Sequence, residues 1–144
     1  VKVAKEIGLP LEEFAPYKVG NWYSEFSQEV YADAATRKVL ASYELTSYTK
    51  VLDFHRSGMG GTIWGVPWEF GRGWHAIAGV GHTKDGQLRI ANSWGEHWDE
   101  DGYIEWNENK INRYLAVDGV VCYGLSDLSV PQIRPYPFSE RFFG

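Results

Sequence analysis

The hydrophobic positions in the first 57 residues recur at intervals of three and four, which is the period of an α-helix. They predict a clear amphipathic helix over residues 45–56. Residues 1–9 are predicted to be the end of a helix, with Gly8 as its C-terminal stop, and residues 24–43 a less regular helical stretch. We therefore interpret residues 1–57 as a helical segment.

From residue 58 the apolar positions alternate with a period of two, which is typical of β-strands. Turn residues such as Asp85-Gly86 separate the runs. Helices followed by strands indicate an α+β fold, with an antiparallel β half over residues 58–128. Residues 129–144 are rich in proline and aromatic residues and are predicted to be extended along a surface of this or another chain. The predicted strands are residues 62–66, 74–80, 88–92, 102–106 and 120–125.

Composition narrows the class of protein. The chain has 144 residues, of which 44% are hydrophobic, so it is one domain at most and can build a core. A net charge of −5 without a basic stripe argues against a nucleic-acid partner. No apolar run suggests a membrane span, and no signal peptide opens the chain. The single cysteine, Cys122, excludes an internal disulfide, so a reducing compartment or a virus particle fits as well as secretion.

The candidate chemistry lies in two short runs of the β half. His75 is near the start of one predicted strand, and Asn92 ends the next. An asparagine oxygen that accepts a hydrogen bond from a histidine ring fixes its tautomer, and the other ring nitrogen can then take a proton from a thiol. Trp94 lies beside Asn92 and would shield such a hydrogen bond from water.

The hairpin between these strands needs an unusual geometry if the pair is to form. A two-residue turn at Asp85-Gly86 would place Asn92 opposite Gly79. That position is roughly 13 Å along the strand from His75, at about 3.3 Å per residue. We therefore expect a loop longer than two residues, together with a β-bulge.

Three runs in this part of the chain resemble the C-terminal half of papain-like cysteine peptidases in their order and spacing. They are residues 75–81, residues 92–95 and residues 98–104. A weaker resemblance links residues 8–17 to the segment that follows the central helix of that family. The resemblance implies a papain-like fold with a barrel-like β half, and a peptide or protein as substrate. It implies no cofactor.

The resemblance also assigns roles to five positions. His75 matches the general base and thiolate partner, and Asn92 matches the residue that orients it. Trp94 matches the residue that shields their hydrogen bond. Gly73 and Trp74 fall where the backbone of the family lines the substrate cleft.

The nucleophile that this site requires has no match in the chain. In the family, a motif resembling Cys-Gly-Ser-Cys-Trp precedes the histidine by about 130–150 residues, which would fall before Val1. Cys122 follows the histidine and is interpreted as a buried structural cysteine. Asn21-Trp22 faintly resembles the nucleophile region, with asparagine in place of cysteine, but lies too close to His75.

The other histidines are not at metal-ligand spacing, so no metal site is expected. We interpret them as surface residues: His55, His82 and His97.

Two functions of different classes therefore stay open. The first is a thiol peptidase, present as its histidine-bearing portion, with the cysteine supplied by an upstream segment. The second is an inactive papain-like scaffold in a larger assembly such as a virus particle. A carbohydrate-binding module, suggested by the seven tryptophans, is disfavoured because Trp94 and Trp98 fit the peptidase pattern. In either case we expect residues 1–56 to expose apolar surface around Val3, Ile7 and Phe14, which an upstream segment, a partner chain or the tail at residues 129–144 would cover.

Overall fold

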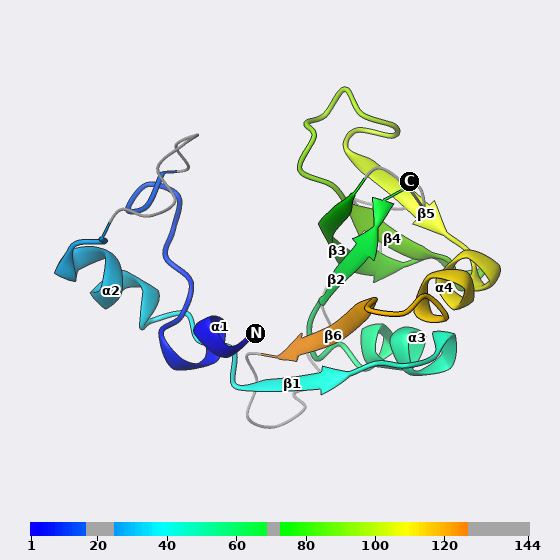
Figure 1. The fold of residues 1–144 in the computed structure, drawn as a ribbon, viewed down its shortest axis with the longest axis horizontal. Coiled ribbons are helices and arrows are strands. Elements are labelled where there is room, and N and C mark those ends of the chain that lie inside the picture. The colour runs from blue at the N-terminus through cyan, green and yellow to red at the C-terminus, as the bar shows by residue number, and fades with distance from the viewer. Residues whose placement is uncertain (17–24, 69–72, 127–144) are drawn as a thin grey trace.

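The computed structural model describes residues 1–16, 25–68 and 73–126 (Figure 1). The Asn21-Trp22 alignment and the tail at residues 129–144 lie outside these ranges. The helices are α1 (Lys2–Glu6), α2 (Gln28–Ala34), α3 (Tyr48–Arg56) and α4 (Glu108–Leu115). The strands are β1 (Ala41–Glu44), β2 (Thr62–Pro67), β3 (Trp74–His82), β4 (Leu88–Ala91), β5 (Tyr103–Trp106) and β6 (Val121–Ser126).

The strands form one antiparallel sheet in the order β1-β6-β2-β3-β4-β5. This confirms the α+β fold class. Within the described residues, β1 and β5 are the two edges and do not pair with each other, so the barrel-like half is an open sheet. β3, which carries His75, is an inner strand between β2 and β4 and is therefore held on both sides.

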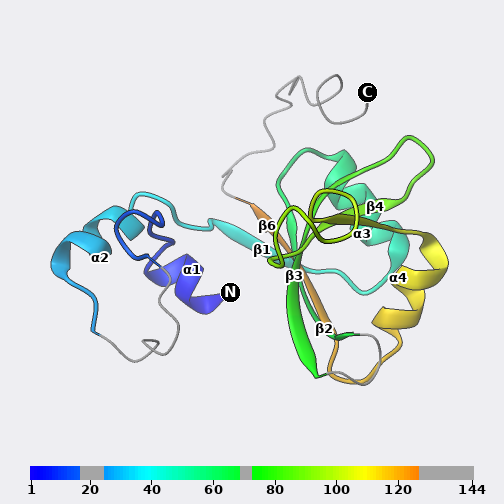
Figure 2. The same ribbon diagram turned by 90° about the horizontal axis from the view of Figure 1, so that it is seen from above.

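One face of the sheet packs against α3 and α4, which lie on the same side of it (Figure 2). Alternate residues of β2 and β3 point into this core, including Trp64, Val66 and Ile77. Phe54 of α3 and Tyr114 of α4 close it from the helical side. Because side chains alternate between faces, a slip of one residue would exchange the buried and exposed sets, and the core therefore fixes the register around His75.

Helix α4 has no counterpart among the elements predicted from the sequence. It begins at a good cap, because the side-chain oxygen of Asn107 accepts a hydrogen bond of 2.9 Å from the backbone N–H of Lys110. Ile111 and Tyr114, three residues apart, are both buried. In the described part of the chain, no helix is long and apolar enough to cross a membrane.

The N-terminal helices form a small unit beside the sheet (Figure 1). Gly8 ends α1 as expected, with a φ of +111°, and a Cβ there would collide with the carbonyl of Ala34 at the end of α2. The exposed apolar surface expected in this region is present at Val3, Ile7 and Phe14.

The prediction of helical structure over residues 24–43 is wrong at its C-terminal end. Residues 41–44 form β1, which pairs with β6, and only Gln28–Ala34 is helical. The N–H of Leu40 donates to the carbonyl of Ser126 at 2.8 Å and extends the pairing. The strand forms because the edge of β6 satisfies its backbone groups, which overrides the weak local pattern.

Candidate active site

The structure brings His75 and Asn92 together. The Nε2 atom of His75 lies 2.7 Å from the Oδ1 atom of Asn92, which is the length of a strong hydrogen bond. His75 is in β3, on the face that packs into the core, and Asn92 comes directly after β4. Both side chains are half-buried, so water competes less for this bond than it would at the surface.

The hairpin has both features that the sequence required. β3 and β4 are joined by residues 83–87, and the N–H of Thr83 donates to the carbonyl of Gln87 at 2.9 Å across the base of this loop. The register then shifts between Gly79 and Gly81, which places a bulge at Val80. The prediction of a longer loop and a bulge is confirmed. Together they carry Asn92 towards the start of β3 and within reach of His75.

The contacts of Asn92 determine which nitrogen of His75 carries the proton. Its Oδ1 atom also accepts the backbone N–H of Ser93 at 2.8 Å. A backbone N–H can only donate, so this atom is the amide oxygen and not the amide nitrogen. The Nε2 atom of His75 must then be protonated to share that oxygen, and the Nδ1 atom of the neutral ring is the one with a free lone pair.

Tryptophan rings enclose the imidazole. Trp94 stacks on it, with ring centroids 5.0 Å apart and planes inclined by 27°. Trp94 is itself 50% exposed, so it forms the outer cover of the hydrogen bond. Trp98 packs edge-on against Trp94 at 5.6 Å.

Trp68 is the residue of this site that the sequence analysis missed. It follows directly after β2 and is 7% exposed. Its ring meets the His75 imidazole edge-on at 5.3 Å and also contacts Trp94 and Trp98. Val66 lies opposite His75 in the β2–β3 pairing. Residues two apart on a strand share a face, so Trp68 would be expected on the same face as Val66 and therefore near His75. This alternation was the sequence signal that could have identified Trp68.

The two expected cleft residues precede His75 on the chain. Gly73 has a φ of +98°, which favours glycine. The side chain of Trp74 is exposed and lies against Gly119, where a Cβ would come within 3.0 Å of the indole. Trp74 points to the face of the sheet opposite the core, so it does not join the rings around His75. The role of Gly73 and Trp74 in lining a substrate cleft stays a prediction.

Cys122 is 2% exposed and lies opposite Trp64 in the pairing of β2 with β6. Burial raises the pKa of its thiol, so the reactive thiolate does not form near neutral pH. The interpretation of Cys122 as a buried structural cysteine is confirmed.

The interpretation of the other histidines as surface residues holds for His97 but is wrong for His55. The Nε2 atom of His55 lies 3.1 Å from the Oγ1 atom of the buried Thr62. Burial, and secondarily the positive charge on His82, lowers the pKa of His55 to about 4. No group of three acidic, histidine or cysteine side chains in the described residues could hold a metal ion.

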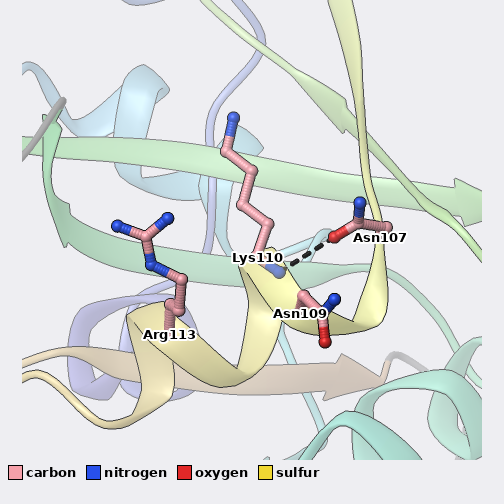
Figure 3. Close-up of a pocket in the computed structure, with 4 residues that line it drawn as sticks. All are labelled: Asn107, Asn109, Lys110 and Arg113. Atoms are coloured by element: carbon pink, nitrogen blue, oxygen red, sulfur yellow. Dashed lines mark hydrogen bonds between the residues drawn. The ribbon is translucent and has the colours of Figure 1, made fainter.

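A concavity of about 380 Å³ lies on α4 (Figure 3). In Figure 3 the side chain of Asn107 points to the backbone of Lys110, while Arg113 extends from the next turn. The residues that line the concavity are Asn107, Asn109, Lys110 and Arg113. None of these supplies a thiol, carboxylate or imidazole.

No protein-family model matches this sequence, and no curated protein resembles it significantly. Solved structures do match the fold. Xylellain, a cysteine protease from Xylella fastidiosa, superimposes with a TM-score of 0.65 at 18% identity, over 88% of this chain and 59% of that protein. The proform of Amb a 11, a cysteine protease and pollen allergen of ragweed, gives 0.60 at 15% identity, over 87% and 43%.

A third match is the cysteine protease CMS1MS2 of Carica candamarcensis, solved in complex with E-64. It gives a TM-score of 0.56 at 18% identity, over 87% of this chain and 65% of that one. The chain thus spans about half the length of the solved structures that it matches. The chain adopts the fold of papain-like cysteine proteases.

Proposed function

We propose that this chain is the histidine-bearing portion of a papain-like thiol peptidase, which hydrolyses peptide bonds by acyl transfer. The observation that carries the proposal is the 2.7 Å hydrogen bond between His75 and Asn92 beneath the stacked ring of Trp94. The substrate would be a peptide or protein. The cysteine would come from a segment outside these 144 residues or from another chain.

The tautomer of His75 suits this chemistry. With Nε2–H donating to Asn92, the Nδ1 atom is the one that can take the proton of a thiol. The resulting thiolate attacks the peptide carbonyl, and the imidazolium then returns its proton to the leaving amine. Asn92 keeps the ring in one orientation throughout, which holds the reacting atoms within a short distance of each other.

The single cysteine of the chain does not fit the role of the nucleophile. Cys122 is buried in the core, and its raised pKa keeps it protonated. The proposal therefore requires a second cysteine, and an adjoining segment that brings it to His75.

The outer face of the sheet, opposite the one that carries the His75 ring, is suited to a docked segment. β2, β3 and β6 carry no charged side chain on this face, and its apolar residues are exposed: Ile63, Trp74, Val80 and Val121. The N-terminal unit also exposes apolar residues, such as Val3 and Leu9. Exposed apolar residues in such number usually mark an interface, so we propose that an upstream segment or partner chain covers them.

A papain-like scaffold within a larger assembly, such as a virus particle, is the second candidate. The observation that favours it is that the only thiol of the chain is inaccessible. The same exposed apolar face would then serve assembly and not completion of a catalytic site.

Hydrolysis by the native polypeptide that contains residues 1–144 distinguishes these functions. The substrate is an unfolded protein, and the release of acid-soluble peptides is measured for the wild type, His75→Ala and the control His97→Ala. His97 is an exposed histidine in the loop between Trp94 and Trp98, so the control also removes an imidazole near these rings but leaves the bond between His75 and Asn92 in place. We expect the first variant to lose hydrolysis and the control to retain it. Hydrolysis that survives His75→Ala, or a folded wild type with no activity, would overturn the peptidase proposal.

A further inference from the structure

Trp68 contacts each of the other three rings of the cluster around His75. Its centroid lies 5.3 Å from that of His75, 5.2 Å from that of Trp94 and 5.9 Å from that of Trp98. Trp94 likewise contacts His75, Trp68 and Trp98. Trp68 and Trp94 therefore both link the imidazole to the rest of the cluster, and Trp68 does so from the buried side.

The position of Trp68 is fixed more firmly than that of Trp94. Trp68 is almost fully buried and belongs to the main core, whereas half of Trp94 is exposed to solvent. Its backbone N–H donates to the carbonyl of Gly73 at 2.8 Å, which ties the end of β2 to the residue just before β3. A stacked ring with so much exposed surface needs a rigid neighbour if it is to hold one orientation, and Trp68 provides that contact.

We propose that Trp68 is a positioning residue for His75. Its ring supports the imidazole directly through an edge-on contact and indirectly by bracing Trp94, so that the ring keeps its Nε2–H on Asn92. A positioning residue acts through another group, and Trp68 needs no contact with substrate. The consequence for catalysis rests on the proposed function, whereas the effect on the imidazole does not.

The alternative is that Trp68 only fills the core. A substitution would then lower the stability of the fold and leave the hydrogen bond of His75 as it is. The two roles therefore predict different results for one measurement, which is the exchange rate of the His75 Nε2–H with water, read by ¹⁵N NMR of histidine-labelled protein. The same spectra report which ring nitrogen carries the proton.

The experiment uses the native polypeptide with Trp68→Leu, Trp68→Phe and the control Trp106→Leu. Trp106 is a fully buried tryptophan of the same core. It contacts Trp64 edge-on and stacks on Tyr114. For Trp68→Leu we expect exchange about tenfold faster, which corresponds to about 1.4 kcal/mol, and a mixture of tautomers. Trp68→Phe keeps a ring and should recover most of the protection. Trp106→Leu should lose stability without faster exchange.

The proposal is overturned if Trp68→Leu folds and keeps the exchange rate and tautomer of the wild type, or if Trp106→Leu changes them as much. If neither leucine variant folds, Trp68→Phe is compared with Trp106→Phe. The His75 Nε2–H should then exchange about threefold faster in Trp68→Phe than in the wild type, and no faster in Trp106→Phe. Equal exchange rates in the two variants would refute the positioning role. If Trp68 variants disturb the imidazole in a polypeptide that hydrolyses no peptide, the proposed function fails and the positioning role stands.

Discussion

Acid should weaken the contact between α3 and the sheet, because His55 is held there in its neutral form. The Oγ1 atom of Thr62 accepts the indole N–H of Trp64 at 3.0 Å, so its own O–H is placed to donate to the unprotonated Nε2 of His55, 3.1 Å away. A protonated ring would place a charge in a half-buried site, which is costly. Burial, with a smaller contribution from His82, lowers the pKa of His55 to about 4.

The size of the effect follows from the two pKa values. The unfolded chain takes up this proton near the ordinary value of 6.5, whereas the folded protein takes it up only near 4. The stabilisation is therefore fully present above pH 6.5 and is lost progressively as the pH falls from 6.5 to 4. At pH 5 the loss amounts to about 2 kcal/mol, at about 1.36 kcal/mol per pKa unit. That is a substantial part of the stability of a small domain.

Urea unfolding followed by tryptophan fluorescence, at pH 7 and at pH 5, measures this loss. His55→Gln keeps a neutral hydrogen-bonding group but cannot titrate, and His97→Gln removes an exposed histidine as the matched control. We expect His55→Gln to lose about 2 kcal/mol less than the wild type between the two pH values, and His97→Gln to behave as the wild type. Equal losses for the wild type and His55→Gln would refute the reasoning.

Three other changes test contacts at the site and in the core. Gly79→Ala should destabilise the fold by about 2 kcal/mol in urea unfolding, because its Cβ would clash with Thr62, and a loss below about 0.5 kcal/mol would contradict this. The thiol of Cys122 should react with an aromatic disulfide reagent only as fast as the protein unfolds, and rapid reaction of the native protein would show that the thiol is accessible. Asn92→Ala should lower the kcat for peptide hydrolysis about tenfold with little change in KM, because the orientation of His75 is lost, whereas an unchanged kcat would remove Asn92 from the mechanism.

The His75–Asn92 pair could be predicted because its determinants are local. Both residues lie in one hairpin, so the chain between them limits their separation. The requirement that the pair should meet then predicted the longer loop and the bulge at Val80, both of which the structure contains.

Trp68 and His55 escaped prediction because their environments come from other segments. The ring of Trp68 meets His75 in β3 and Trp94 after β4, and nothing in the local sequence marks these contacts. His55 is polar and ends an amphipathic helix, which is typical of a surface position. The ring of His55 is nevertheless half-buried. Gly79 has no side chain, which leaves room for Thr62 and His55 to contact each other there.

Two short elements, β1 and α4, were also not predicted from the sequence. The four residues of β1 contain too few alternations to distinguish a strand from a helix, and their strand structure depends on pairing with β6, which lies about 80 residues later. The eight residues of α4 are similarly short, although the cap at Asn107 was a usable signal.

The central claim is that His75 and Asn92 serve a cysteine nucleophile, and covalent labelling tests it most directly. The native polypeptide that contains residues 1–144 is treated with a thiol-directed peptidyl epoxide, and the modified residue is located by mass spectrometry in the wild type and in His75→Ala. We predict an adduct on a cysteine other than Cys122, formed in the wild type and lost in the variant. No adduct on the folded wild type, or the same adduct in both proteins, would contradict the claim.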